Sequence, residues 1–249
     1  RKRSQLKRRG DLTWVQAKQL ALSGWVEGMK EVEKYRVSIL PIITDRVLRF
    51  QPVYQMAGYA VDVGTYLANQ PECFISREFE ERNYPGKIYK LVCSISFSGV
   101  IEPEIIIQRG AMICALIDAI EYAGHRAEVI CNCAMSYKND EDSRKGKRKD
   151  DGWFEVSVTV KKPSQPLEMT DLAFCLAHPA MLRRMMFSVA EIERWSDVAL
   201  TYGYPAEATD KGDLYVQEFY SKLSLSDSQA TEWVLERLQN LGVNIEVSR

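Results

Sequence analysis

The chain has 249 residues, of which 46% are hydrophobic and 27% charged, and its formal net charge is -1 at pH 7. A chain of this length can bury a substantial core without disulfides or metal. It contains no run near the ~18 apolar residues of a membrane span, and no apolar signal segment follows its basic N-terminus. We therefore expect a soluble cytoplasmic protein, and its six sparse cysteines agree with a reducing compartment.

The first third of the chain predicts a basic arm and a helical lobe. Residues 1–10 carry six basic and no acidic side chains, which is typical of a solvated arm or an anion-binding segment. From about residue 13 to 35, apolar residues at helical spacing predict one helix, kinked at its glycines. Residues 41–60 contain two prolines and predict irregular structure, and Asp62 predicts the N-cap of a short helix. We assign residues 1–86 to the basic arm and a mostly helical N-terminal lobe without strong strands.

From residue 87 onward the pattern changes to that of an α/β domain. Residues 87–97 alternate in polarity and predict a strand, and Pro103 and Gly124 mark the ends of a long buried helix. Two further alternating runs predict strands on either side of a mobile basic hairpin loop at 138–152. Later elements are expected as a helix at 169–189 broken at His178-Pro179, a strand at 214–220, a helix from Ser226 to about Leu241 and a strand at 243–247. This order predicts a mixed sheet flanked by helices over residues 87–249.

A serine-rich loop follows the first strand of that domain, in KLVCSISFSG at 90–99. With this loop, the order of elements resembles the von Willebrand factor type A fold, a Rossmann-like fold whose metal site opens with D-x-S-x-S. The matching residues are Ser94, Ser96 and Ser98, and Thr170 matches the later threonine of that site. Serine stands where the family has aspartate. Because hard cations need anionic oxygen ligands, we expect a degenerate site without metal.

Three mostly apolar phrases carry a second, narrower resemblance. They are VDVGTYLANQPECFI at 61–75, RGAMICALIDAIEYAGH at 109–125 and LAFCLAHPAMLRRMMF at 172–187. In these phrases, length and character, the chain resembles the single-stranded-DNA-binding RNA polymerase cofactors of N4-like phages. The resemblance implies a non-enzymatic protein that binds single-stranded DNA and helps a viral RNA polymerase begin middle transcription in the host cytoplasm. It identifies no DNA contacts, because the matching phrases are structural.

The candidate DNA-binding residues combine cations, which follow phosphates, with aromatic rings on which bases stack. The run RKGKRK at 144–149 lies between two aromatic residues, and Trp153 either packs in the core or contacts DNA. Trp14 lies on an apolar helical stripe and is expected in the core. Arg183 and Arg184 contact either DNA or a nearby acid. The full candidate set is Arg1, Lys2, Arg3, Lys7, Arg8, Arg9, Tyr137, Arg144, Lys145, Lys147, Arg148, Lys149, Trp153, Arg183 and Arg184.

The sequence predicts no catalytic, metal or cofactor site. Neither GxGxxG nor GxxxxGK[ST] occurs, and the two histidines, His125 and His178, lie far apart without a set of zinc ligands around them. The expected partners are single-stranded DNA and a viral RNA polymerase, without a membrane, and self-association stays open. The alternative function is a protein-interaction module that uses the loop face of Ser94, Ser96, Ser98 and Thr170.

Overall fold

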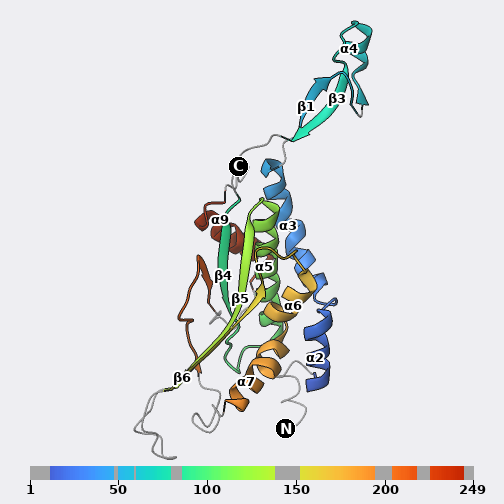
Figure 1. Cartoon of the computed structure of the whole chain (residues 1–249). Coiled ribbons are helices and arrows are strands. Elements are labelled where there is room, and N and C mark those ends of the chain that lie inside the picture. The colour runs from blue at the N-terminus through green and yellow to red at the C-terminus, as the bar shows by residue number, and fades with distance from the viewer. Residues whose placement is uncertain are drawn as a thin grey trace, which may run out of the picture.

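The computed structural model describes residues 12–47, 50–58, 60–79, 86–137, 152–193, 204–217 and 225–243 (Figure 1). The helices in these ranges are α2 (Trp14–Ser23), α3 (Met29–Val47), α4 (Val63–Leu67), α5 (Pro103–Tyr122), α6 (Met169–Ala177), the π-helix η1 (Met181–Met186), α7 (Phe187–Ile192) and α9 (Asp227–Asn240). The strands are β1 (Phe50–Gln55), β2 (Ala60–Val61), β3 (Phe74–Phe79), β4 (Ile88–Ser94), β5 (Arg126–Tyr137), β6 (Gly152–Lys161), β7 (Tyr204–Pro205) and β8 (Leu214–Val216). The predicted mixed α/β class is confirmed.

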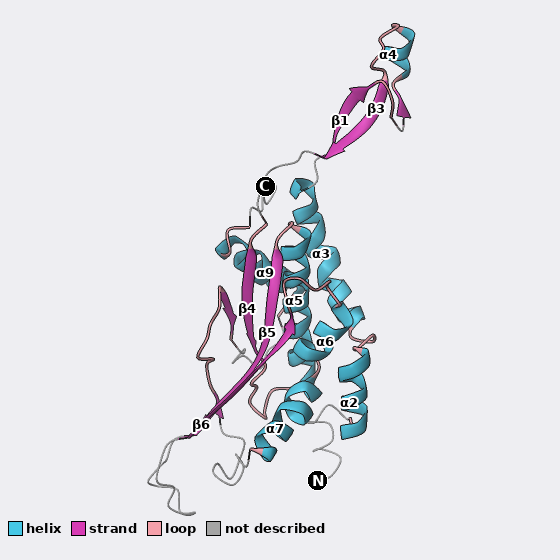
Figure 2. Cartoon of the chain, viewed as in Figure 1, coloured by secondary structure: helices cyan, strands magenta, loops and turns pink. Residues whose placement is uncertain are grey.

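The main sheet is mixed and has the strand order β6-β5-β4-β8 (Figure 2). Strand β4 pairs in parallel with β5 on one side and with β8 on the other, and α5 connects β4 to β5. Strand β6 runs antiparallel to β5 and forms the predicted hairpin with it, while β7 pairs with β5 at Met135 and Ser136. Because later strands of the chain lie on both sides of β4, with β5 on one side and β8 on the other, the sheet has a switch point at the carboxyl ends of β4 and β8.

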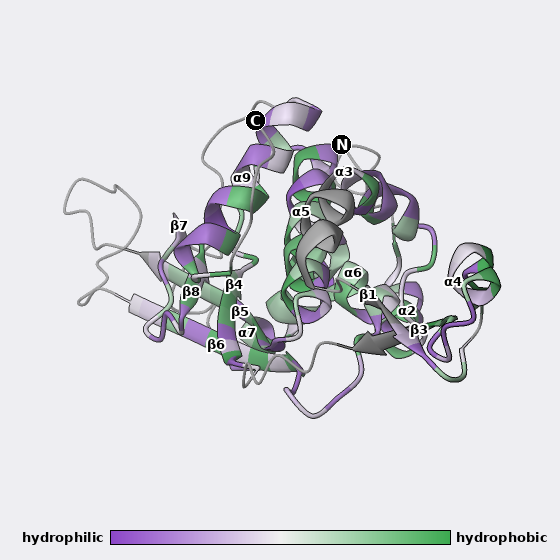
Figure 3. Ribbon diagram, turned by 90° about the horizontal axis from the view of Figure 1, so that it is seen from above, coloured by the Kyte–Doolittle hydropathy of each residue, from purple (hydrophilic) through white to green (hydrophobic). Residues whose placement is uncertain are grey.

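Helix α5 is the centre of the hydrophobic core. Its sequence is apolar on nearly every side, and it packs against the sheet and contacts the helices α3, α6 and α9 (Figure 3). The inward residues of β4, such as Leu91 and Cys93, are fully buried against this layer, as are Val129 and Cys131 of β5. The predicted start at Pro103 is confirmed, and the helix ends just before Gly124, whose φ of 82° is left-handed.

The segment 206–213 lies against part of the opposite face of the sheet. The N–H of Ala206 donates to the carbonyl of Ala134, and Lys90 forms an ion pair with Asp210. Asn132 and Ala134 of β5 are fully buried on this face. A loop therefore supplies the second layer here.

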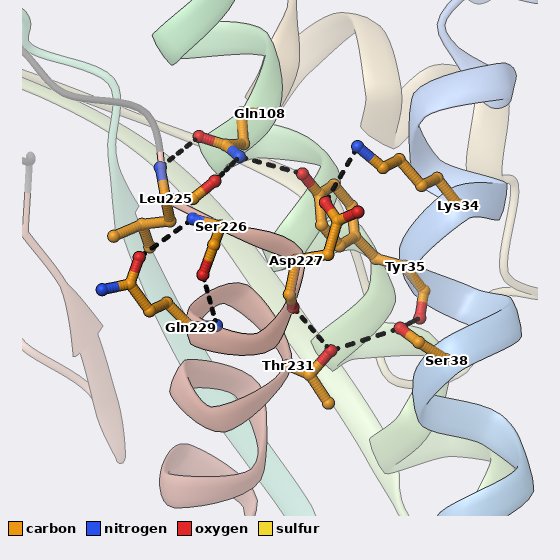
Figure 4. A network of polar contacts seen from close by, with 9 residues as sticks. All are labelled: Lys34, Tyr35, Ser38, Gln108, Leu225, Ser226, Asp227, Gln229 and Thr231. Atoms are coloured by element: carbon orange, nitrogen blue, oxygen red, sulfur yellow. Dashed lines mark hydrogen bonds and ion pairs between the residues drawn. The ribbon is translucent and has the colours of Figure 1, made fainter.

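A polar network fixes α9 against α3 and α5 (Figure 4). The Gln108 amide nitrogen donates to the Tyr35 hydroxyl oxygen at 3.0 Å and to the Leu225 carbonyl at 2.7 Å. The Leu225 N–H donates back to Gln108 at 2.9 Å, and Lys34 pairs with Asp227 at 2.9 Å. The predicted capping box at the start of α9 is confirmed: Ser226 accepts from the backbone N–H of Gln229, whose side chain accepts in return from the backbone N–H of Ser226.

The N-terminal region is helical, as predicted, but the single kinked helix is wrong. Helices α2 and α3 are separate, and Gly24 between them has a φ of 74° that favours glycine. A Cβ at Gly24 would lie 2.5 Å from the hydroxyl oxygen of Thr170, and the N–H of Trp25 donates to the carbonyl of Thr170. The break therefore lets the lobe contact the start of α6.

The prediction of irregular structure over residues 41–60, without strong strands, is also wrong. Helix α3 continues through Pro41 to Val47, and β1, β3 and β2 form a separate three-stranded sheet. Pro52 is tolerated in β1 because this strand lies at the sheet edge, where one side needs no partner. This small sheet lies beyond the end of α3 (Figure 1). The predicted helix after Asp62 is confirmed as α4, with the Asp62 carboxylate accepting from the N–H of Thr65 at 3.0 Å.

The break at His178 and the strand near 214 are confirmed, the latter for Leu214–Val216. The predicted strand at 243–247 falls mostly outside the described residues, as does the loop 138–152 except Gly152, which begins β6. The division into residues 1–86 and 87–249 stays a prediction.

Candidate nucleic-acid interface

Most of the predicted DNA-binding cations lie outside the described residues. These are Arg1, Lys2, Arg3, Lys7, Arg8, Arg9, Arg144, Lys145, Lys147, Arg148 and Lys149. The structure does describe the two strand ends from which the basic loop departs, because Tyr137 ends β5 and pairs with Gly152 at the start of β6. The side chain of Tyr137 also lies outside the described part. The described part of the candidate interface is therefore the end of the β5–β6 hairpin.

Trp153 is the predicted site residue that this hairpin end presents to solvent. It follows Gly152 in β6, and its side chain is 52% exposed. Its indole N–H donates to the carboxylate of Glu155, which lies two residues along the strand on the same face. Of the two alternatives for Trp153, the structure thus favours surface exposure over core packing.

Glu155 is itself held in place by several donors. The N–H of Thr209 donates to it at 3.0 Å, the Thr209 hydroxyl donates to its second oxygen, and the Asn132 side-chain nitrogen donates at 2.8 Å. Burial raises the pKa of Glu155, but the hydrogen bonds from Thr209, Asn132 and Trp153 outweigh this and hold the pKa below its ordinary value of 4.5. The carboxylate is therefore ionised at neutral pH and anchors the tryptophan.

A second exposed aromatic residue, Tyr204, lies near this tryptophan. Ser136 of β5 pairs with Trp153 of β6 on one side and with Tyr204 of β7 on the other. Tyr204 is 75% exposed. The sequence analysis missed Tyr204, because its position depends on a strand pairing between segments far apart in the chain. A lone tyrosine before a proline gave no signal of that pairing.

Arg183 and Arg184 each make a hydrogen bond within the fold. Arg183 is buried, and its guanidinium donates to the carbonyl of Ile101 at 3.0 Å. Arg184 is half-buried and donates to the carbonyl of Leu12 at 3.0 Å. These bonds show a structural role for both arginines, and the two alternatives from the sequence, DNA or a nearby acid, stay predictions. The two arginines tie the η1 helix to the loop before α5 and to the segment before α2.

The expectation that Trp14 packs in the core is wrong. The residue is 45% exposed, and the residue of α2 that is buried is Ala17. The inward face of α2 is formed by Ala17 and Leu20, three residues apart. Trp14 lies off that face, so it stays an exposed aromatic residue close to the basic arm in sequence.

The serine loop is used for internal hydrogen bonds. Ser94 and Ser96 are each 2% exposed. The Ser96 hydroxyl accepts from the N–H of Ala134 at 2.9 Å and donates to the Cys133 sulfur at 3.6 Å, and its N–H donates to the Ser94 hydroxyl oxygen. Thr170 lies instead beside Gly24, against the N-terminal lobe. Because two of these hydroxyls are buried and Thr170 contacts another region, the four residues do not form one exposed loop face.

A buried arginine lies at the switch point of the sheet. Arg109 of α5 is 1% exposed, and its guanidinium donates to the carbonyls of Val216 at 2.9 Å and Gln217 at 2.6 Å. The guanidinium carbon lies 5.2 Å from the ring centre of Phe97, the residue after Ser96. The cation thus holds the end of β8 against the serine loop.

Burial disfavours the charged forms of Cys93, Cys175 and His178. Burial raises the pKa of Cys93 and of Cys175 to about 12, so both thiols stay protonated at neutral pH. His178 accepts from the N–H of Ala180 at 3.0 Å, and burial lowers its pKa to about 4. Among the described residues, no group of three or more histidine, cysteine, aspartate or glutamate side chains is arranged to hold a metal ion.

Fold and site together define a mixed α/β protein in which two exposed aromatic residues, Trp153 and Tyr204, lie at one hairpin end. The chain belongs to the family described as "Domain of unknown function (DUF7192)", whose model matches residues 1–245. No curated protein and no solved structure matches the chain. Within the described ranges, no helix is both long and apolar enough to cross a membrane. The von Willebrand A-like detail of the fold stays a prediction.

Proposed function

We propose that the chain is a non-enzymatic protein that binds single-stranded DNA through the end of the β5–β6 hairpin. The observation that carries this proposal is Trp153, a half-exposed tryptophan fixed by Glu155 at the base of a loop whose sequence contains five cations in RKGKRK. Proteins that bind single strands without sequence preference combine such cations with exposed rings.

The distribution of charge supports a local contact with an anionic polymer. The whole chain has a net charge of -1, yet residues 1–10 and 144–149 are strongly basic. Binding through such clusters releases counterions from the phosphates and so weakens steeply as salt rises. A chain that is uniformly near neutral would instead show little dependence on salt.

The finer proposal is that this protein acts as a cofactor of a viral RNA polymerase in the cytoplasm of the infected host. It is supported by the resemblance of 61–75, 109–125 and 172–187 to the cofactors of N4-like phages. Its test is transcription by such a polymerase on a double-stranded promoter template, with and without the protein. Stimulation that disappears when the strands are already separated agrees with the proposal, and an unchanged rate on both templates contradicts it.

The DNA-binding proposal is tested by fluorescence anisotropy of a labelled single strand of ~30 nucleotides and of its duplex, at several salt concentrations. We expect tighter binding to the single strand and a steep salt dependence. Alanine at the five cations of 144–149, or deletion of 1–10, should weaken binding and flatten the salt slope. Thermal stability should change little, because exposed charges contribute little to folding.

The matched control replaces Lys18 and Lys30, two exposed cations of α2 and α3, by alanine. This variant should keep the salt slope of the wild type. If the wild type does not bind the single-stranded probe, or binds the duplex equally well, the proposed function is wrong.

A further inference from the structure

Three side chains form a row across the exposed end of the main sheet. Ser136 is paired directly with Trp153 on one side and with Tyr204 on the other. Residues that are directly paired in antiparallel strands project from the same face. Since neighbouring strands are ~4.8 Å apart, the two aromatic residues are anchored about 10 Å from each other, with only a serine between them.

The segments that carry the two aromatic residues are held in place by hydrogen bonds. The Trp153 indole is tied to Glu155, and the N–H of Thr209 donates to the same carboxylate at 3.0 Å. The segment that carries Tyr204 is therefore attached at two points, to Ser136 by strand pairing and to Glu155 through Thr209. The two residues are nevertheless 52% and 75% exposed. Rigid attachment together with exposure leaves ring faces available to another molecule at little entropic cost.

We propose that Trp153 and Tyr204 form a platform on which successive bases of single-stranded DNA stack, with Ser136 as the gap between the two rings. This inference rests on the proposed function and adds its base-contacting residues. Because every base has an aromatic face, such a platform binds without strict sequence preference. A sheet face that carries two exposed rings is also a known arrangement for stacking two or three unpaired bases.

The charge of the neighbouring sequence and the exposed rings indicate which kind of nucleic acid binds the row. In the sequence, the five cations of 144–149 lie between β5 and β6, the strands that contribute Ser136 and Trp153, and such a basic run favours an anionic polymer as the occupant. Duplex DNA keeps its bases stacked inside and offers no free base faces. The row therefore fits a single strand better than a duplex.

The test compares two labelled probes of equal length, oligothymidylate and a strand of the same phosphate backbone without bases. Trp153→Ala and Tyr204→Ala should each raise Kd for oligothymidylate by about 5- to 150-fold, with the salt slope unchanged. On the baseless strand, both variants should bind like the wild type. Trp153→Phe and Tyr204→Phe keep a ring and should restore most of the affinity.

Tyr66→Ala is the matched control, because Tyr66 is 59% exposed on α4, outside the row. It should bind like the wild type, and circular dichroism should show that all variants fold. If both alanine variants of the row bind oligothymidylate as tightly as the wild type, the platform is wrong while single-strand binding stands. If the phenylalanine variants bind oligothymidylate as weakly as the alanine variants, the rings do not act by stacking on bases, and the platform is also wrong. A wild type that binds neither probe contradicts the proposed function itself.

Discussion

Replacement of Gly110 by alanine is expected to destabilise the protein by disturbing the contact between α5 and α6. Gly110 lies in the buried centre of α5. A Cβ built there would lie 2.5 Å from the carbonyl oxygen of Leu176, and closer still to the Cα and Cβ atoms of Ala177. These atoms belong to the backbone of α6 or are attached directly to it. A rotamer change cannot relieve the clash, so one helix must move.

Two opposing effects decide the size of the change at Gly110. Alanine favours the helical state over glycine by about 1 kcal/mol in a helix interior. Overpacking of a tight core costs about 1 to 3 kcal/mol, and contacts with backbone atoms place this site at the upper end. The free energy of unfolding should therefore fall by about 2 kcal/mol. For a protein of this size, that corresponds to a decrease in Tm of about 4 to 8 °C.

Thermal unfolding followed by circular dichroism measures this change. Gly99→Ala is the matched control, because a Cβ at Gly99 meets no atom within 4 Å. The control should melt within about 2 °C of the wild type, since surface substitutions usually change stability by less than about 0.5 kcal/mol. If Gly110→Ala melts at or above the wild-type temperature, helix propensity outweighs the clash, and the close packing of α5 on α6 is refuted.

Two further changes test the polar interior. Gln108→Leu should lower the free energy of unfolding by about 1 to 3 kcal/mol in urea titrations, because it leaves the N–H and carbonyl of Leu225 without their partner. A variant as stable as the wild type would show that the network of α9 contributes little. Burial lowers the pKa of His178 from 6.5 to about 4, so the folded protein favours the neutral imidazole. The free energy of unfolding should therefore be unaffected by this group above pH 6.5 and should fall by about 3 kcal/mol as the pH drops from 6.5 through 4. His178→Asn keeps an acceptor for the N–H of Ala180 and should make the free energy of unfolding less dependent on pH between 6.5 and 4. If the pH dependence is the same as in the wild type, His178 does not cause it.

Elements with strong local patterns could be predicted from the sequence. The alternation in β4 and β5 places one set of side chains in the core, and the burial of Leu91, Cys93 and Cys131 agrees with it. Proline and glycine marked the two ends of α5, because proline fits the first helical turn and Gly124 adopts a left-handed φ. The hairpin of β5 and β6 followed from two alternating runs around a charged loop.

Features that depend on distant partners could not be predicted. The small sheet contains Pro52, which argues against a strand until the pairing shows that β1 is an edge. The two arginines of η1 were expected to contact DNA or a nearby acid, and no local pattern indicated that the carbonyls of Ile101 and Leu12 accept their hydrogen bonds. Tyr204 is brought to Trp153 only by the pairing of β7 with β5. Local periodicity contains no information about any of these contacts.

Side chains of the protein itself occupy the switch point of the sheet. In open α/β sheets, ligands usually bind outside the carboxyl ends of the strands, where the strand order reverses. Here Arg109 fills that place, since its buried guanidinium binds the carbonyls that follow β8 and lies over Phe97. The hydroxyl of Ser96, which resembles a metal ligand in sequence, binds the backbone of Ala134 instead. Because Arg109 and Ser96 already bind backbone groups of the protein here, we propose that the ligand binds at the exposed aromatic row near the carboxyl end of β5 instead.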